Sequence, residues 1–256
     1  MKYRGILLSI LTMALLATFI QPAHADWVEV DKFTGTMYIS DKGLVKNIAT
    51  DKSGMWSIMD LNDGSITMVD PRKKTYTIIF PEKFCSQVTT MMDNMMSEMT
   101  AEDRAMMEQM MGAGGKRPSP RVRVTKKGSG GVVAGNKTDR YIVTVNGKPF
   151  KDVYLAPNAS IMKDVRKFIT KSTEMSAQME SCSQMGPGVH TTAPEMSKEY
   201  LGLAQKGWTM KEVNTDSGKV EKEVLSLKKK SIPSSEFRVP TGYKKVEMRR
   251  LMGGGR

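Results

Sequence analysis

Short hydrophobic runs separated by turn residues make up the first part of the chain. Between Trp27 and Phe80, runs of about five residues alternate apolar and polar positions. Turns containing Asp, Asn and Gly separate these runs, as at residues 41–43 and 62–64. The same pattern returns from Arg121 to Leu155 and from Trp208 to Leu227. Alternation with short polar turns is typical of antiparallel strands joined by hairpins. The pattern therefore predicts an antiparallel meander interrupted by helices.

Helical periodicity begins after Pro81, a residue that suits a first helical turn. On a helical wheel, seven apolar side chains then fall within about 140° of one another. They are Phe84, Val88, Met91, Met92, Met95, Met96 and Met99. A capping-box pattern at residues 100–103 predicts that a second methionine-rich helix follows.

A longer helix is expected from Asn158 or Ser160 to about Met185, because residues 186–188 read Gly-Pro-Gly and stop it. Its apolar positions are Ile161, Val165, Phe168, Ile169, Met175 and Met179.

Residues 1–25 have the features of a secretory signal peptide. Lys2 and Arg4 give a basic start, residues 5–20 form an uncharged apolar run, and an Ala-His-Ala sequence ends at Ala25. The run is shorter than the ~20 residues that a membrane span needs. We therefore expect cleavage after Ala25 and a periplasmic or secreted protein, with an uncleaved anchor as the alternative.

Composition narrows the classes of function. The chain has 256 residues, a net charge of +12, 23 methionines, two cysteines and two histidines. One histidine lies in the predicted signal peptide, so His190 alone remains for chemistry. Catalytic triads and histidine-ligated metals therefore lack their parts, and no CxxC, P-loop, nucleophile-elbow or GxGxxG motif occurs. We expect a non-enzymatic protein without a cofactor.

The two cysteines lie at helix ends. Cys85 begins the first predicted helix and Cys182 ends the long one, so antiparallel packing of the two helices would bring the thiols together. An exported compartment permits their oxidation. The bond would close a loop of about 100 residues, for which chain entropy gives about 4–5 kcal/mol. A Cys85–Cys182 disulfide is the favoured interpretation, and two buried thiols or soft-metal ligation are the alternatives.

The methionine stripe has three interpretations. A stripe at helical spacing is most often part of a core. It can also form an adaptable apolar surface for acyl chains or partner segments, because the thioether side chain is unbranched. Soft sulfur ligands also select Cu(I) or Ag(I). For that metal site, the ligands at spacings of four would be Met91, Met95 and Met99.

The positive charge is spread along the chain. The longest basic run is at residues 228–230, with pairs at 126–127 and 249–250. A solvated surface explains most of this charge, and an anionic membrane surface is the next possibility. Nucleic acid is not an expected partner, since no aromatic and basic platform is present. We expect a monomer.

Three phrases carry a resemblance to a known family. Residues 70–76 read Asp-Pro-Arg-Lys-Lys-Thr-Tyr, residues 135–141 read Gly-Asn-Lys-Thr-Asp-Arg-Tyr, and residues 232–243 begin Ile-Pro-Ser-Ser-Glu-Phe. With the order of elements, they resemble secreted bacterial domains of unknown function related to periplasmic lipoprotein carriers of the LolA and LolB type. The resemblance implies an α+β fold, in which a strongly curved antiparallel sheet forms a half-barrel and helices pack on its concave face.

The expected organisation is thus a signal peptide at 1–25, one LolA-like domain at 26–243 and a disordered basic, glycine-rich tail at 244–256. The methionine-rich helical insert at about 82–111 departs from the family pattern. The favoured function is binding of an apolar or lipidic ligand, an acyl chain or lipoprotein, in the concavity. The predicted binding residues are the seven of the stripe. A Cu(I)/Ag(I)-binding protein and an envelope structural protein with a sealed core are the alternatives.

Overall fold

The computed structural model describes residues 26–50, 53–81, 97–110, 120–183 and 193–247, together with positions 83, 86 and 90. The predicted signal peptide, Cys85 and most of the predicted methionine stripe lie outside these residues. The cleavage site and the disulfide therefore stay predictions.

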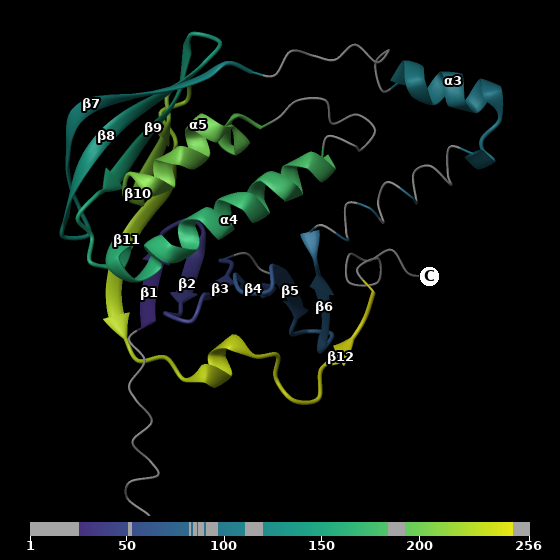
Figure 1. The fold of residues 1–256 in the computed structure, drawn as a ribbon, viewed down its shortest axis with the longest axis horizontal. Coiled ribbons are helices and arrows are strands. Elements are labelled where there is room, and N and C mark those ends of the chain that lie inside the picture. Colours follow the sequence, from purple (N-terminus) through teal and green to yellow (C-terminus); the bar gives the residue numbers. More distant parts are fainter. Residues whose placement is uncertain are drawn as a thin grey trace, which may run out of the picture.

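Twelve strands of the described residues form one sheet (Figure 1). The first six are β1 Asp26–Asp31, β2 Gly35–Ile39, β3 Leu44–Ile48, β4 Trp56–Asp60, β5 Ser65–Asp70 and β6 Thr75–Ile79. The others are β7 Val122–Val133, β8 Asn136–Val145, β9 Lys148–Ala156, β10 Trp208–Asn214, β11 Val220–Lys230 and β12 Lys244–Lys245. Their spatial order is β12-β6-β5-β4-β3-β2-β1-β11-β10-β9-β8-β7.

Strands β1 to β6 are an up-and-down meander, as the alternation predicts. Each strand pairs antiparallel with the next, for example Val45 of β3 with Met59 of β4. Glycines at positive φ make the tight connections, including Gly43 (φ 82°) and Gly64 (φ 75°). Glycine adopts this left-handed conformation without the steric cost that a Cβ atom brings.

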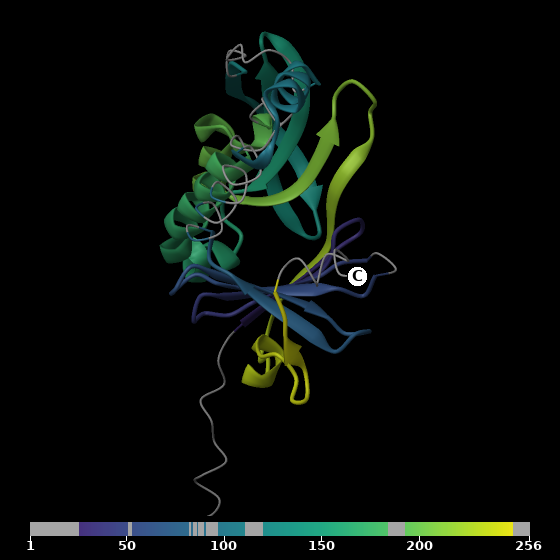
Figure 2. The same ribbon diagram turned by 90° about the vertical axis from the view of Figure 1, so that its right-hand side faces the viewer.

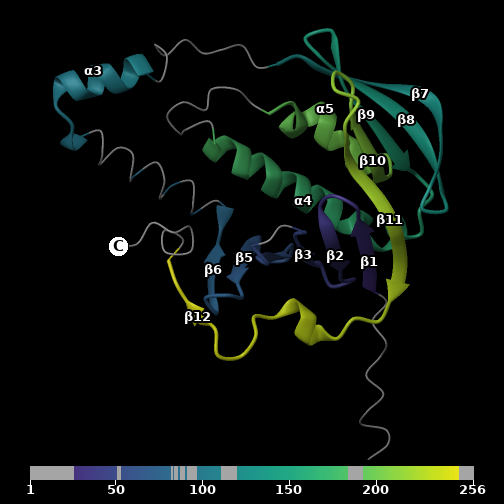
Figure 3. The same cartoon turned by 180° about the vertical axis from the view of Figure 1, so that it is seen from behind.

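Strand β11 joins the two halves of the sheet. Its residues Val224–Lys230 pair with β1, and Val220–Glu223 pair with β10. The register shifts in both ladders, which marks a bulge or irregularity on each side. Figure 3 shows β11 running from β1 to the long strands β7 to β10. One continuous sheet results, although the chain builds it in two parts.

The helix predicted near residues 160–185 is confirmed as α4, Ile161–Ser183. Its buried residues Ile161, Val165 and Ile169 pack against Trp27 of β1 and Met210 of β10 in the main core. Thr100 caps α3, Ala101–Met110, as predicted: the backbone N–H of Asp103 donates to Thr100 Oγ1 at 3.1 Å, and the Thr100 hydroxyl donates to Asp103 Oδ2 at 2.7 Å.

The other helical segments whose bounds fall within the described residues are short. They are η1 Pro194–Met196, α5 Lys198–Leu201, η2 Gly202–Gln205 and η3 Ser234–Phe237. In Figure 2, α4 and α5 lie on one side of the meander strands, whereas η3 lies on the other. Helices α4 and α5 thus cover one face of the sheet, η3 lies on the opposite face, and β12 extends the edge of the sheet beside β6.

The predicted strongly curved antiparallel half-barrel is wrong. The sheet is large, open and not strongly curled, and it is mixed because β12 runs parallel to β6. Alternation specifies which side chains share a face, but it does not specify how far the sheet bends. The expected curvature came from the family resemblance and not from the strand pattern. Residues 244 and 245, assigned to the tail by sequence, are strand β12.

Candidate functional site

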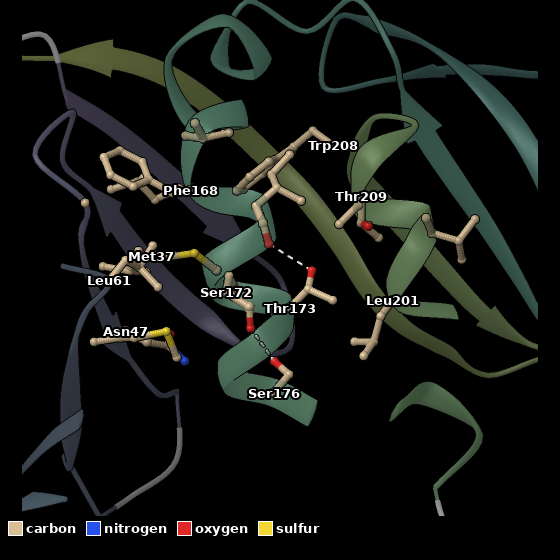
Figure 4. A pocket seen from close by; sticks show the side chains of 18 of the residues that line it. Met37, Asn47, Leu61, Phe168, Ser172, Thr173, Ser176, Leu201, Trp208 and Thr209 are labelled. Atoms are coloured by element: carbon tan, nitrogen blue, oxygen red, sulfur yellow. Dashed lines mark hydrogen bonds between the residues drawn. The ribbon is translucent and has the colours of Figure 1, made fainter. Parts of the chain in front are cut away.

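An apolar pocket lies between the sheet and the helices α4 and α5. Its volume is about 440 Å³. The strands β2, β3 and β4 form one wall with alternate residues, which include Met37, Val45 and Met59. Helix α4 contributes Phe168 on the facing side, and β10 contributes Trp208 (Figure 4).

The remaining described lining residues come from the same elements and from β9, α5, η2 and the turns between strands. They are Ile39, Ser40, Gly43, Asn47, Ser57, Leu61, Val153, Val165, Ile169, Ser172, Thr173, Ser176, Tyr200, Leu201, Leu203, Ala204, Thr209 and Glu212. Most are apolar or small, so the pocket is suited to hydrocarbon.

The turn between β2 and β3 contacts α4 at Gly43. A Cβ atom at Gly43 would lie 2.7 Å from the ring of Phe168, closer than a real Cβ contact. Glycine is therefore needed here both for its positive φ and for this close approach. The contact fixes the distance between the meander wall and the helix.

Trp208 is held against the pocket by a buried carboxylate. Its Nε1 donates to Oε2 of Glu29, a residue only 1% exposed. The other oxygen of Glu29 pairs with Lys222 Nζ at 2.8 Å. Because both carboxylate oxygens have partners, the buried charge of Glu29 is compensated and the indole orientation is fixed.

A network of ionic side chains fixes the part of the pocket wall that β9, β10 and α5 form. The ammonium of Lys151 lies 2.9 Å from Glu221, 3.1 Å from Glu195 and 3.3 Å from Glu212. Burial alone would lower the pKa of Lys151, but the hydrogen bond to Glu221 and the other carboxylate charges outweigh it and hold this pKa above its ordinary range. The same hydrogen bond lowers the pKa of Glu221.

Tyr200 connects this network to the pocket. Its hydroxyl donates to Glu212 Oε1 at 2.8 Å, and both residues line the pocket. Burial, followed by the charge of Glu212, raises the pKa of Tyr200 far above its ordinary value, so the phenol stays protonated. The network thus ties η1 and α5 to β9, β10 and β11, and it holds α5 over the pocket.

Comparison with known proteins adds no family. No protein-family model matches the sequence, and no curated protein matches it. A solved structure described as an uncharacterized conserved protein from Thermus thermophilus is similar at a TM-score of 0.40 and 9% identity. The alignment covers 92% of this chain and 98% of that one.

Six of the seven binding residues predicted from sequence lie outside the described residues. They are Phe84, Val88, Met91, Met92, Met95 and Met96. Met99 is described, but it lies half-buried in a bend before α3 and is not among the residues that line the pocket. The role of the stripe in apolar or Cu(I) binding stays a prediction.

The pocket residues of β2 to β4 were missed by the sequence analysis. Their signal was present, since Met37, Val45, Asn47 and Met59 occupy alternate positions of predicted strands. Ser172 and Ser176, one turn apart in α4, also interrupt the apolar face of that helix.

Among the described residues, no helix combines the length and the apolar character that crossing a membrane requires.

Proposed function

We propose that this protein is an exported, non-enzymatic binding protein that holds an apolar or lipidic ligand between the sheet and helices α4 and α5. The observation that carries the proposal is the pocket of about 440 Å³, walled mainly by apolar side chains of β2 to β4, α4 and β10. This volume lies within the range of about 300–1,000 Å³ that small-molecule sites occupy.

Two further features support the proposal. The wall residues Met37 and Met59 are unbranched and adapt to chains of different shape. The predicted signal peptide directs the protein to a compartment where lipids and lipoproteins are handled. The proposed ligand is therefore an acyl chain, either free or attached to a larger molecule.

The test fills the pocket without removing an interaction. Ser172 lines the pocket from α4, and its side chain is half-buried. In the variant Ser172→Phe, the ring occupies ligand volume. Ala177 lies on the same helix but is exposed, so Ala177→Phe is the matched control.

Binding is measured by displacement of a fluorescent fatty-acyl probe from the purified mature protein. We expect the parent and Ala177→Phe to bind the probe equally and Ser172→Phe to lose at least about tenfold in affinity. Circular dichroism checks that both variants are folded. Absence of probe binding by the parent, or equal binding by all three proteins, would contradict the proposed function.

A further inference from the structure

The two ends of the pocket differ in chemistry. The contact between Gly43 and Phe168 joins the meander wall to α4. Asn47 lies four residues beyond Gly43 and lines the pocket from β3. Ser172 and Ser176 lie about one and two turns beyond Phe168 and line it from α4. Polar residues thus follow this contact along both β3 and α4.

The part of the pocket around Asn47 is polar. Ser57 stands directly opposite Asn47 on the neighbouring strand β4, and Ser172 lies one turn before Ser176 on α4. Figure 4 shows Asn47, Ser172 and Ser176 toward one end of the pocket and Phe168 and Trp208 toward the other. The pocket thus pairs a hydrocarbon end with a hydrogen-bonding end, as an amphiphile requires.

The polar groups at this end are uncharged. The hydroxyl of Ser176 donates to the backbone carbonyl of Ser172 at 2.9 Å, and that of Thr173 donates to Ile169 at 2.8 Å. Their protons are thereby used, so these hydroxyls present lone pairs to a ligand. A ligand hydroxyl can donate to these lone pairs and also accept from the Asn47 amide, whereas an ionised carboxylate can only accept and leaves these lone pairs without a donor.

The charge around the pocket also disfavours an anion. Among the described lining residues, Glu212 alone carries a formal charge, and that charge is negative. The nearby cation Lys151 has three ammonium protons and three carboxylate partners, Glu195, Glu212 and Glu221. It therefore has no proton left for a ligand carboxylate.

We infer that the ligand is an amphiphile with an uncharged, hydroxyl-bearing head group, such as a monoacylglycerol, rather than a fatty-acid anion. This inference rests on the proposed function and adds the class of head group. The acyl chain extends toward Phe168 and Trp208. The head group donates to the serine hydroxyls of α4 and accepts from the Asn47 amide.

Two probes with the same chain test the inference. They are 1-monopalmitoylglycerol and palmitate, compared in one buffer at about pH 8, where the carboxyl of palmitate is ionised. Affinities are measured by competition against one fluorescent acyl probe. We expect the glycerol ester to bind at least about tenfold more tightly. In Asn47→Leu and Ser176→Ala, this ratio should fall toward one.

The control variant is Asn158→Leu, at an exposed asparagine that is not among the lining residues, and it should keep the parent ratio. Equal affinities in the parent, tighter palmitate binding, or a ratio unchanged in both pocket variants would overturn the head-group assignment while the proposed function stands. Binding of neither probe would overturn the proposed function itself. The two failures are therefore distinguishable.

Discussion

Replacement of Lys151 by methionine tests the ionic network that holds α5 over the pocket. Lys151 is 5% exposed, and its ammonium compensates three carboxylates within 3.3 Å. Methionine keeps most of the length of the side chain but removes the charge. The variant Lys151→Met thus leaves Glu195, Glu212 and Glu221 facing one another around an apolar tip.

The magnitude follows from how well those carboxylates can reach water. Removing one partner of a buried ion pair costs about 3–5 kcal/mol. The side chains of Glu195 and Glu221 are each 35% exposed and can turn outward, whereas Glu212 is only 18% exposed. We therefore expect the lower end of the range, about 3 kcal/mol. For a protein of this size, the melting temperature should fall by about 6–12 °C.

Urea unfolding at neutral pH, followed by tryptophan fluorescence, gives the free energy of unfolding. The matched control is Lys126→Met. The ammonium of Lys126 lies 2.7 Å from Asp139, but the lysine side chain is 54% exposed. Since exposed ion pairs contribute little to stability, the control should lose much less than Lys151→Met.

The pH dependence gives a second measurement. Hydrogen bonding to Lys151 lowers the folded-state pKa of Glu221 below 4.5, so its stabilising contribution is present above pH 4.5 and is lost as the pH falls through the folded pKa. The pKa of Lys151 is raised above 10.5, so its contribution is present below pH 10.5 and is lost as the pH rises through the folded pKa. The deficit of Lys151→Met should therefore be largest between these limits and shrink in acid. A deficit no larger than that of Lys126→Met, or one that does not change with acid, would refute the reasoning.

Three further predictions concern other parts of the chain. Gly43→Ala should destabilise the protein more than Gly64→Ala in urea unfolding, because both glycines have positive φ but only Gly43 approaches the Phe168 ring; equal losses would mean that the approach is unimportant. Thiol titration of the exported, denatured protein should find no free thiol, and two free thiols would exclude the Cys85–Cys182 bond. Replacement of Trp208 by phenylalanine should abolish the ligand-induced change in tryptophan emission and retain binding, since Trp208 lines the pocket; an unchanged signal would place the ligand elsewhere.

Local signals explain what the sequence could predict. The hairpins around Gly43 and Gly64 follow from turn residues between alternating runs, and α4 follows from its apolar face and from the Gly-Pro-Gly that follows it. The Thr100 cap was also predictable, because its pattern spans only four residues. Each of these features depends on interactions between close neighbours in the chain.

The remaining features depend on distant pairs. The parallel pairing of β12 with β6 joins residue 244 to residue 75, and the two-residue strand has no alternation to reveal it. The openness of the sheet depends on the twist and bulges of all its strands together. The Lys151 network draws its charged partners from η1, β10 and β11, so no spacing along the chain marks it.

The pairing of β1 with β11 has a consequence for when the protein can fold. Asp26 pairs with Lys230, so the strand at the start of the described chain requires a partner from near its end. The meander from β2 to β6 needs only sequential neighbours and can form early, but β1 keeps one open edge until residue 230 is available. Contacts this distant in sequence form slowly, because the intervening loop must be closed first. Refolding should thus show a fast phase for the meander and a slow phase for the joining of the two halves of the sheet. A chain still being synthesised stays incompletely folded until its last strands have been made.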